Sequence, residues 1–266
     1  MAHQVEGTRG APRLLLLQGQ ANSHRWWQHV RPLLTDRFFT VTFDYRGTGD
    51  TARLQRDSEA EDETDWSTRQ FAADAAAVLT ALGARSAFVY GTSMGGRIAQ
   101  ELAIARPDLV RGLVLACTTP GGAVATERSR EVRLALASPD ADARLRTTVD
   151  LFYTPEWVAA RGGYQRVPRH LFGDPAISRR DASRHLRMSA KHDAAERLSQ
   201  IMAPTLILHG VHDVFAPAVT ATALGDLIPG SEVWVHPTGR HGFFDEFAAE
   251  VTARVTDFLT SPQGRG

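Results

Sequence analysis

The sequence predicts an α/β protein, in which a mostly parallel central sheet is covered by helices on both faces. Short apolar runs rich in β-branched residues alternate along the chain with longer stretches of helical period, and this alternation is typical of parallel strands joined by helices. The runs are also nearly all apolar, as expected of strands that are buried on both faces. With 266 residues and a hydrophobic share of 43%, the chain is long enough for one large core.

Six strands are expected, each an apolar run that ends near glycine, proline or polar residues. They are Arg13–Leu17, Phe38–Phe43, Ala87–Tyr90, Gly112–Ala116, Thr205–Leu208 and Val233–Val235. Only about a dozen residues precede the first of these runs, which is a short N-terminal segment for a chain of this size.

Three helices are expected from apolar residues at helical spacing. They cover residues 67–82, residues 94–105 and a segment from near Phe243 to Phe258. The first opens with Ser67 and Gln70 in the spacing of a capping box and ends at Gly83. The second stops before Pro107, which cannot continue a helix.

Residues 120–200 break this alternation, because they look helical and contain no convincing strand. We interpret them as an inserted helical cap, the cap segment, between two parts of the core domain at residues 1–119 and 201–266. Its basic residues near one helical face either attract an anionic substrate or are simply solvated; they are Arg180, Arg184, Arg187 and Lys191. The acidic run 57–65 is interpreted as a hydrated loop, because metal ligands need a convergent geometry.

Composition argues against several classes of partner. The chain has 30 basic and 30 acidic residues, whereas nucleic-acid binding normally needs a basic excess. Cys117 is the single cysteine, so no internal disulfide or thiolate metal cluster is expected, which suits a reducing compartment. The apolar run 14–17 is too short for a signal-peptide core or a membrane span. We therefore expect a cytoplasmic protein without a nucleic-acid, membrane or metal partner.

A candidate nucleophile follows the third expected strand. After Tyr90 the chain reads Gly91, Thr92, Ser93, Met94 and Gly95, and then turns helical. A Gly-x-Ser-x-Gly pentapeptide between a strand and a helix places the serine in a sharp, strained turn, where a Cβ on either glycine would collide with nearby backbone. The sequence therefore predicts an exposed Ser93 hydroxyl above a helix N-terminus, whose N–H groups favour negative charge.

A serine hydroxyl needs a base within hydrogen-bond reach and an acid that orients that base. Asp213 lies on the loop after the strand 205–208, and His241 lies on a glycine-flanked loop after the last strand. None of the nine other histidines follows the last strand on such a loop. The order serine, acid, histidine, with each residue after its own strand, predicts a catalytic triad of Ser93, Asp213 and His241.

With these motifs in place, the sequence resembles the α/β-hydrolase fold family over nearly the whole chain. The matching segments are the nucleophile elbow at 91–96, the acid loop at 210–213, the histidine loop at 239–242 and the structural Asp-x-Arg-Gly-x-Gly turn at 44–49. The resemblance implies a serine hydrolase with a helical cap, similar to small esterases, enol-lactonases and cofactor-free haloperoxidase-like members. It also implies that the N-terminal antiparallel hairpin of the family is reduced or missing here.

The resemblance further implies an oxyanion hole. The step Gln18, Gly19, Gln20 falls where family members commonly have a His-Gly step, with Gln18 in place of the customary histidine. By that match, the backbone N–H groups of Gln20 and Met94 are expected to bind the oxyanion.

The leading hypothesis is hydrolysis of a small-molecule ester or lactone through an acyl-enzyme on Ser93, without a metal or organic cofactor. The same triad also supports carbon–carbon bond hydrolysis, perhydrolysis or a non-hydrolytic biosynthetic step, and the fold alone also suits a ligand-binding receptor. Trp26, Tyr153 and Trp157 are candidate pocket residues, with core or cap packing as the alternative. The oligomeric state stays open, a homodimer included.

Overall fold

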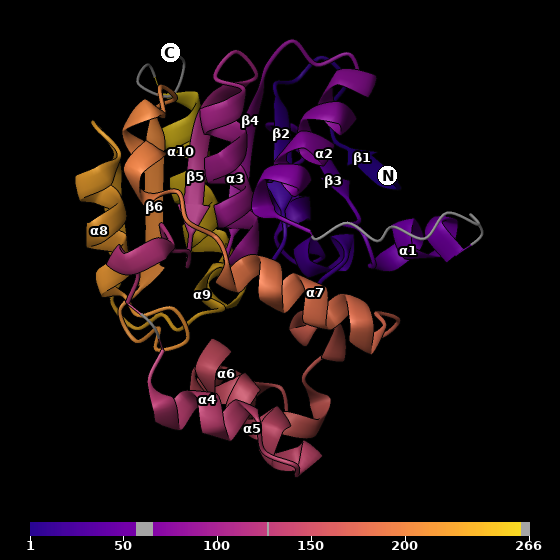
Figure 1. The fold of residues 1–266 in the computed structure, drawn as a ribbon, viewed down its shortest axis with the longest axis vertical. Helices are drawn as coiled ribbons and strands as arrows, with labels where there is room; N and C mark the ends of the chain where they lie inside the picture. The colour runs from indigo at the N-terminus through magenta and orange to yellow at the C-terminus, as the bar shows by residue number, and fades with distance from the viewer. Residues whose placement is uncertain (57–65, 127, 262–266) are drawn as a thin grey trace.

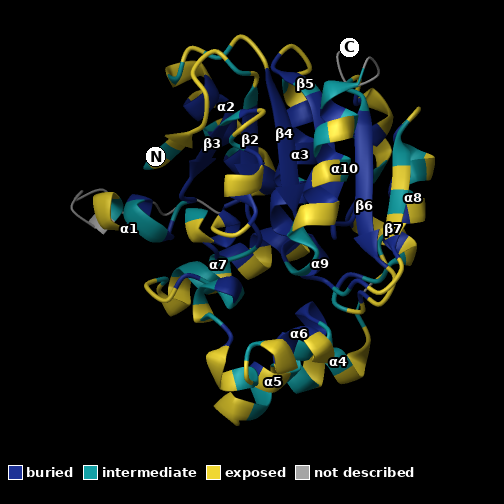
Figure 2. Ribbon diagram, turned by 180° about the vertical axis from the view of Figure 1, so that it is seen from behind, coloured by how far each residue is buried: buried dark blue, intermediate teal, exposed yellow. Residues whose placement is uncertain are grey.

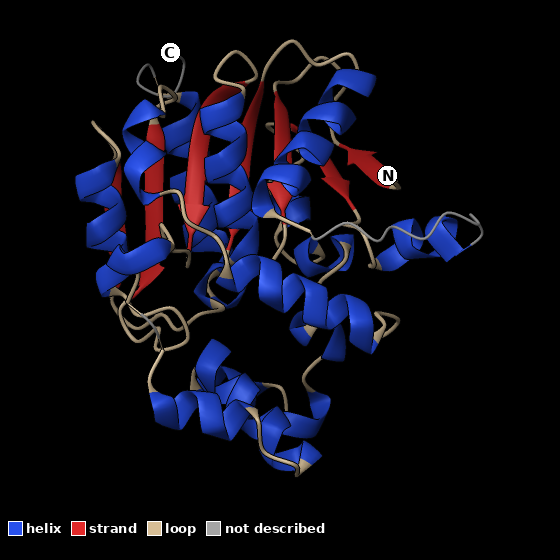
Figure 3. Ribbon diagram, in the orientation of Figure 1, coloured by secondary structure: helices blue, strands red, loops and turns tan. Residues whose placement is uncertain are grey.

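A seven-stranded sheet forms the centre of the computed structural model, which describes residues 1–56, 66–126 and 128–261 (Figures 1 and 3). The strand order is β1-β3-β2-β4-β5-β6-β7, with β1 antiparallel to β3 and every other neighbouring pair parallel. The strands are β1 (His3–Glu6), β2 (Arg13–Leu17), β3 (Phe39–Phe43), β4 (Ala87–Thr92), β5 (Val110–Ala116), β6 (Thr205–Gly210) and β7 (Glu232–His236). The predicted fold class, including all six expected strands, is confirmed.

Among the strands of the described residues, β1 is not among those predicted from the sequence. Its four residues are largely exposed and carry no apolar run, so periodicity gave no signal for it. β1 pairs with β3, with Val5 opposite Val41, and not with β2, which follows it in the chain. The N-terminal hairpin is therefore reduced to a single antiparallel edge strand.

Helices cover both faces of the sheet (Figure 1). On one face lie α2 (Thr68–Ala81), α3 (Met94–Ala105) and α8 (Val219–Leu227), and on the other lies α10 (Ala248–Thr260). Along β2 the side chains point alternately to the two faces of the sheet, as the pleat requires. Leu15 and Leu17 lie in the core under α2, α3 and α8, whereas Leu14 and Leu16 lie in the core under α10. The inner strands β2 to β6 are consequently buried on both sides, whereas the edge strands β1 and β7 and the outer helix faces are partly exposed (Figure 2).

Two of the three predicted helices have the expected bounds and the third is broken. α2 begins after Ser67, whose hydroxyl accepts a hydrogen bond from the Gln70 N–H at 3.1 Å. The predicted continuous helix after Phe243 is wrong: α9 (Phe243–Glu246) and α10 are separated by Phe247 at φ −105° and ψ 40°. The ring of Phe247 stacks on the His236 ring with centroids 4.0 Å apart, and this tertiary contact accompanies the break between the two helices.

The cap segment lies beyond the carboxyl ends of the parallel strands (Figure 3). It contains α4 (Arg130–Leu136), α5 (Ala141–Phe152), α6 (Pro155–Ala160) and α7 (Arg179–Ala190), while the short α1 (Gly49–Arg56) precedes α2. The 3-10 helices are η1 (His24–Trp27), η2 (Arg31–Leu33), η3 (Gly122–Val124), η4 (Tyr164–Arg166), η5 (Arg169–Phe172) and η6 (Ala195–Gln200). Within the described part of the cap segment, extended pairing is limited to a bridge between Gly121 and Asp193.

The basic residues of α7 do not share one environment. Arg180, Arg187 and Lys191 are exposed, whereas the Arg184 guanidinium lies 4.5 Å from the centre of the Trp66 ring. One of the four therefore packs against the core. The acidic run 57–65 lies outside the described residues. Among the described residues, none of the helices combines the length and hydropathy that crossing a bilayer requires.

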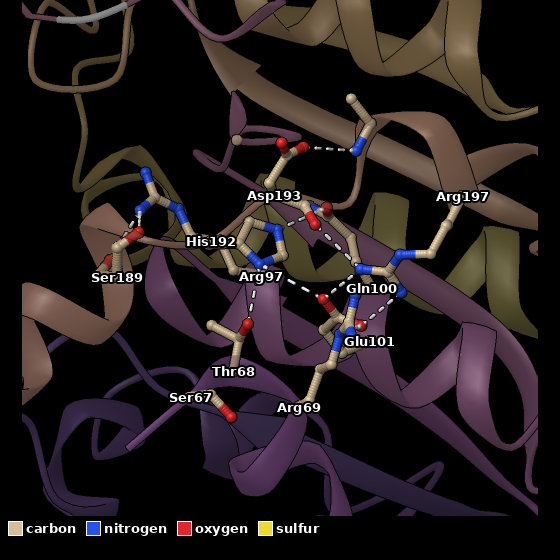
Figure 4. A network of polar contacts seen from close by, with 12 residues as sticks. Ser67, Thr68, Arg69, Arg97, Gln100, Glu101, Ser189, His192, Asp193 and Arg197 are labelled. Atoms are coloured by element: carbon tan, nitrogen blue, oxygen red, sulfur yellow. Dashed lines mark hydrogen bonds and ion pairs between the residues drawn. The ribbon is translucent and has the colours of Figure 1, made fainter. Parts of the chain in front are cut away.

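A buried polar network ties the end of the cap segment to α2 and α3 (Figure 4). The His192 imidazole bonds the Thr68 hydroxyl at 3.0 Å and the Gln100 side-chain oxygen at 3.2 Å. Arg197 donates to both carboxylate oxygens of Glu101, at 2.8 and 2.7 Å. Burial, together with nearby arginines, lowers the pKa of His192 to about 3, so this histidine is neutral in the folded protein.

Candidate active site

Three loops bring Ser93, Asp213 and His241 together at the carboxyl edge of the sheet. The loops follow β4, β6 and β7, which run in parallel and therefore end at the same edge. The His241 Nε2 atom lies 3.1 Å from the Ser93 Oγ atom, and its Nδ1 atom lies 2.7 Å from an Asp213 carboxylate oxygen. The arrangement is a continuous hydrogen-bond chain from carboxylate to imidazole to hydroxyl.

Ser93 occupies a strained turn between β4 and α3. Its φ of 53° and ψ of −119° lie in a region that residues with a side chain rarely adopt. A Cβ on Gly91 would stand 2.8 Å from the Gly96 Cα, and one on Gly95 would stand 2.6 Å from the Gln18 carbonyl oxygen. Both glycines are therefore needed for this turn. Ser93 is partly exposed, although its neighbours on both sides are buried.

Asp213 is buried but fully hydrogen-bonded. One carboxylate oxygen accepts hydrogen bonds from the backbone N–H groups of Phe215 at 2.9 Å and Ala216 at 2.8 Å, and the other faces His241. Burial on its own raises the pKa of Asp213, but His241 and His209 outweigh it and hold this pKa far below the ordinary range. The carboxylate is therefore ionised and acts as an acceptor.

The ionised Asp213 fixes the tautomer of His241. Because Nδ1 faces a carboxylate, it carries the proton, and Nε2 presents a lone pair to the Ser93 hydroxyl. The ring is buried between Phe152, at a centroid distance of 4.9 Å, and Phe215, at 4.6 Å. This arrangement suits a general base that works in a site of low dielectric.

The cap segment holds the backbone of the histidine loop. The His241 N–H donates to the Leu151 carbonyl at 3.2 Å, and the Gly242 N–H donates to the Phe152 carbonyl at 2.8 Å. The Tyr153 hydroxyl donates to Asp245 at 3.1 Å. These bonds come from the end of α5, and no motif in the sequence indicated them.

The two predicted oxyanion donors lie on neighbouring backbone segments. Met94 is the first residue of α3, where an N–H has no intrahelical partner. Among the hydrogen bonds of the described residues, the Gln20 N–H donates none. The close approach of Gly95 to the carbonyl oxygens of Leu17 and Gln18 places the start of α3 against the loop 18–20.

The Gln18 side chain is used in holding the loop 18–20 to β3. The side-chain amide nitrogen of Gln18 donates to the Phe43 carbonyl at 2.7 Å, and the backbone carbonyl of Gln18 accepts from the Tyr45 hydroxyl at 3.2 Å. The nearby turn 44–49 is also structural, since the Asp44 carboxylate accepts from the backbone N–H groups of His24 and Asp50 at 2.8 and 2.9 Å.

The candidate pocket residues occupy two layers. The Trp26 indole N–H donates to the Thr92 hydroxyl at 2.9 Å, and its ring lies 6.3 Å from that of Phe152. The Tyr153 ring stacks on Trp157 with centroids 3.7 Å apart. Trp26 thus lies beside Phe152, whose ring contacts that of His241. Tyr153 lies beside Gly242, and Trp157 is separated from Gly242 by the Tyr153 ring on which it stacks.

Two buried histidines, His209 and His185, contact the site or its neighbouring backbone, and the sequence did not predict this role for either of them. His209 Nε2 lies 2.8 Å from the Ala216 carbonyl and 3.3 Å from the Asp213 carboxylate. Its position four residues before Asp213 was the available signal. His185, on α7, contacts the backbone beside Gln20, and a lone histidine in an amphipathic helix gave no comparable signal.

The fold and the grouping of these three side chains define the class of protein as a hydrolase. A model of the alpha/beta hydrolase fold matches residues 12–248, and the chain belongs to that family.

Relatives and solved structures extend this comparison. The chain is 26% identical over 264 residues to a protein of Caulobacter sp. (strain K31) named "Putative carbamate hydrolase RutD", covering 97% of this chain and 95% of the relative. It is similar in fold to a hydrolase from Pseudomonas aeruginosa (TM-score 0.78, 22% identity, 97% and 94% covered). It is also similar to the enol-lactonase from Burkholderia xenovorans LB400 (TM-score 0.77, 19% identity, 97% and 96% covered).

Proposed function

We propose that this protein is a serine hydrolase that cleaves a small-molecule carboxylic ester or lactone through an acyl-enzyme on Ser93. The observation that carries the proposal is the hydrogen-bond chain from Asp213 through His241 to the hydroxyl of the partly exposed Ser93. A hydroxyl is a weak nucleophile at neutral pH, and an adjacent imidazole that is braced by a carboxylate overcomes that weakness.

In the first half-reaction, the Ser93 oxygen attacks the substrate carbonyl while His241 Nε2 takes the hydroxyl proton. The N–H groups of Gln20 and Met94 stabilise the tetrahedral oxyanion. The intermediate collapses as His241 donates its proton to the leaving alkoxide. An ester then releases a free alcohol and leaves the acylated serine, whereas a lactone leaves an acyl chain on Ser93 that carries the new hydroxyl. Asp213 stays ionised throughout and balances the charge of the imidazolium.

In the second half-reaction, His241 takes a proton from water, and the resulting hydroxide attacks the acyl-enzyme. Collapse of this intermediate returns the proton to Ser93 and releases the carboxylic acid. The aromatic rings of Phe152 and Phe215 beside His241 keep bulk water from the imidazole, which strengthens its interaction with Asp213.

Trp26, Tyr153 and Trp157 are proposed to contribute apolar surface near the acyl group. The polar atoms of Trp26 and Tyr153 are already bonded, to Thr92 and Asp245, so these side chains offer a substrate rings rather than hydrogen-bond donors. This arrangement favours uncharged, largely apolar acyl groups.

Carbamate hydrolysis is a second candidate, because the sequence relatives carry that name. A carbamate presents a carbonyl carbon to Ser93 in the same way, and His241 then protonates either the leaving alkoxide oxygen or the leaving nitrogen, which releases an alcohol or an amine. A panel of p-nitrophenyl esters, lactones, alkyl carbamates and β-diketones, with Ser93→Ala as the blank, separates these reactions. Turnover of esters or lactones alone supports the first candidate, and turnover of carbamates alone supports the second.

A ligand-binding receptor on the same fold is tested by covalent labelling. A fluorophosphonate probe is expected to label Ser93 stoichiometrically in the wild type and not in Ser93→Ala, with labelling strongly slowed in His241→Ala. A wild type that stays unlabelled and turns over no member of the panel would overturn the proposed hydrolase.

A further inference from the structure

His185 connects the cap segment to the loop that carries Gln20. It lies on α7, its side chain is fully buried, and its Nδ1 atom accepts a hydrogen bond from the Ala21 N–H at 3.2 Å. Its Nε2 atom donates to the Arg46 carbonyl at 2.8 Å. One ring nitrogen faces a donor and the other an acceptor, so only the neutral tautomer with a proton on Nε2 satisfies both contacts.

The peptide between Gln20 and Ala21 is held at both ends. The Asn22 side-chain amide donates to the Gln20 carbonyl at 3.0 Å, while His185 accepts from the Ala21 N–H. The Ala21 carbonyl accepts in turn from the Asp174 N–H at 2.7 Å, which is a second contact with the cap segment.

These contacts hold a backbone conformation that alanine does not favour. Ala21 has a φ of 60°, in the left-handed region where a Cβ is strained. Such a conformation persists only where its surroundings enforce it. Without the acceptor on His185, the Ala21 N–H is left without a protein partner in a partly buried position, which favours rearrangement of the loop.

We infer that His185 is a positioning residue for the oxyanion hole: from the cap segment, it fixes the peptide after Gln20 and thereby the direction of the Gln20 N–H. The inference rests on the proposed function, because it concerns the donor that this function assigns to Gln20. The cap segment then has a part in the chemical step as well as in covering the site.

The surroundings of His185 keep it in the required state. The rings of Trp66 and Phe71 lie 5.3 and 5.4 Å from the imidazole, and that of Tyr45 lies at 6.2 Å. Burial among these rings lowers the pKa of His185 to about 4, although the Arg46 carbonyl and Asp181 act in the opposite direction. Nδ1 therefore keeps its lone pair at neutral pH.

Two substitutions separate the two contacts of this ring. In His185→Asn, the side-chain oxygen takes the place of Nδ1 and can still accept from Ala21. In His185→Gln, the amide reaches the place of Nε2 and can still donate to Arg46, but the acceptor for Ala21 is lost. We expect His185→Gln to lower kcat about 10- to 100-fold with KM nearly unchanged, because an oxyanion donor acts mainly in the transition state. His185→Asn is expected to recover most of this loss.

His192→Gln is the matched control. His192 is also a buried, neutral histidine near the end of the cap segment, but its partners are Thr68 and Gln100, away from the triad loops (Figure 4). It is expected to lower the melting temperature and leave kcat unchanged. The inference is overturned if His185→Gln keeps the kcat of the wild type. It is equally overturned if the Asn and Gln variants of His185 lose kcat only in proportion to their loss of melting temperature.

A measurement on the wild type does not depend on the folding of a variant. Long-range ¹H–¹⁵N NMR spectra of the histidine rings report which nitrogen of His185 carries the proton. A proton on Nε2 and a bare Nδ1 agree with the inference, whereas a proton on Nδ1 overturns it, since the Ala21 N–H then has no acceptor. Failure of the proposed function is recognised separately, because the wild type then neither reacts with the fluorophosphonate nor turns over any ester, lactone or carbamate.

Discussion

Gly210 and Gly239 lie backbone to backbone, so that a Cβ on Gly210 would stand 2.5 Å from the Gly239 carbonyl carbon. The His212 N–H also donates to the Gly239 carbonyl at 2.9 Å. The acid loop and the histidine loop are thus in direct backbone contact. This contact sets the separation from which Asp213 and His241 reach each other.

Gly210→Ala is expected to push these two loops apart. Misplacing a catalytic group by about 1 Å costs on the order of 10²-fold in rate, so we expect a loss of kcat of that size together with a lower melting temperature. The measurements are ester turnover and thermal unfolding. Gly230→Ala is the control: Gly230 has a φ of 72° with open space around it, so this variant is destabilised by about 1 kcal/mol and keeps its activity. Full activity of Gly210→Ala would contradict this account of the loops.

Asp213→Asn tests the assignment of the acid. The amide cannot accept the Nδ1 proton of His241 as a carboxylate does and favours the wrong tautomer, so kcat is expected to fall by about 10⁴-fold. Steady-state kinetics on the best ester, with circular dichroism to check the fold, measure this effect. A loss below about tenfold in a folded variant would show that another group orients His241.

His209 is expected to support Asp213 at the same carboxylate oxygen that faces His241. His209→Leu removes a donor 3.3 Å from the carboxylate, and the pKa of Asp213 should rise as a result. We expect kcat to fall by about tenfold, roughly the effect of one lost hydrogen bond to a charged group. His209→Gln, which keeps a donor near the place of Nε2, should retain more activity. Equal kcat values for the two variants would disprove this role.

Stability should fall as the pH is lowered below about 6.5, because His185 and His192 are buried in neutral form. Their pKa values in the folded protein are about 4 and about 3, below the ordinary value of 6.5. The unfolded chain therefore binds more protons between these values, and the folded state loses a few kcal/mol across that window. His29 acts in the opposite direction, since its hydrogen bond with Asp245 raises its pKa, but its side chain is 39% exposed.

Urea unfolding near pH 7 and at about pH 4.5 measures this dependence, and the acidic value should be the lower one. The double variant His185→Asn, His192→Asn lacks both imidazoles. Its unfolding free energy should be lower than that of the wild type at pH 7 and should change less between the two pH values. Equal unfolding free energies of the wild type at the two pH values would contradict the prediction.

The sequence predicted those parts of the molecule that local patterns encode. The strands β2 to β7 stand out as short apolar runs, the helices α2 and α3 show helical periodicity, and Gly91, Gly95 and Gly242 mark turns whose geometry excludes side chains. Because each of Ser93, Asp213 and His241 follows a strand of an expected parallel sheet, the sequence predicted that their loops meet at one edge of that sheet.

The remaining features depend on contacts between distant segments. Edge strand β1 is defined by its pairing with β3, and the break at Phe247 by stacking on His236. The Ala21 contact of His185 joins positions 164 residues apart. No single-sequence pattern reports such pairs, because a buried histidine on a helix looks the same whether it serves the core or a loop.

The backbone bonds from Leu151 and Phe152 to the histidine loop bear on protein engineering. In a chimera that receives the cap segment of a relative, residues 150–154 are exchanged too, so the relative's backbone then sets the position of the carbonyls that hold the His241 loop. Grafts that join donor and host after residue 154 and before α7 leave both this scaffold and His185 in place, so they can alter substrate choice without dismantling the reaction centre.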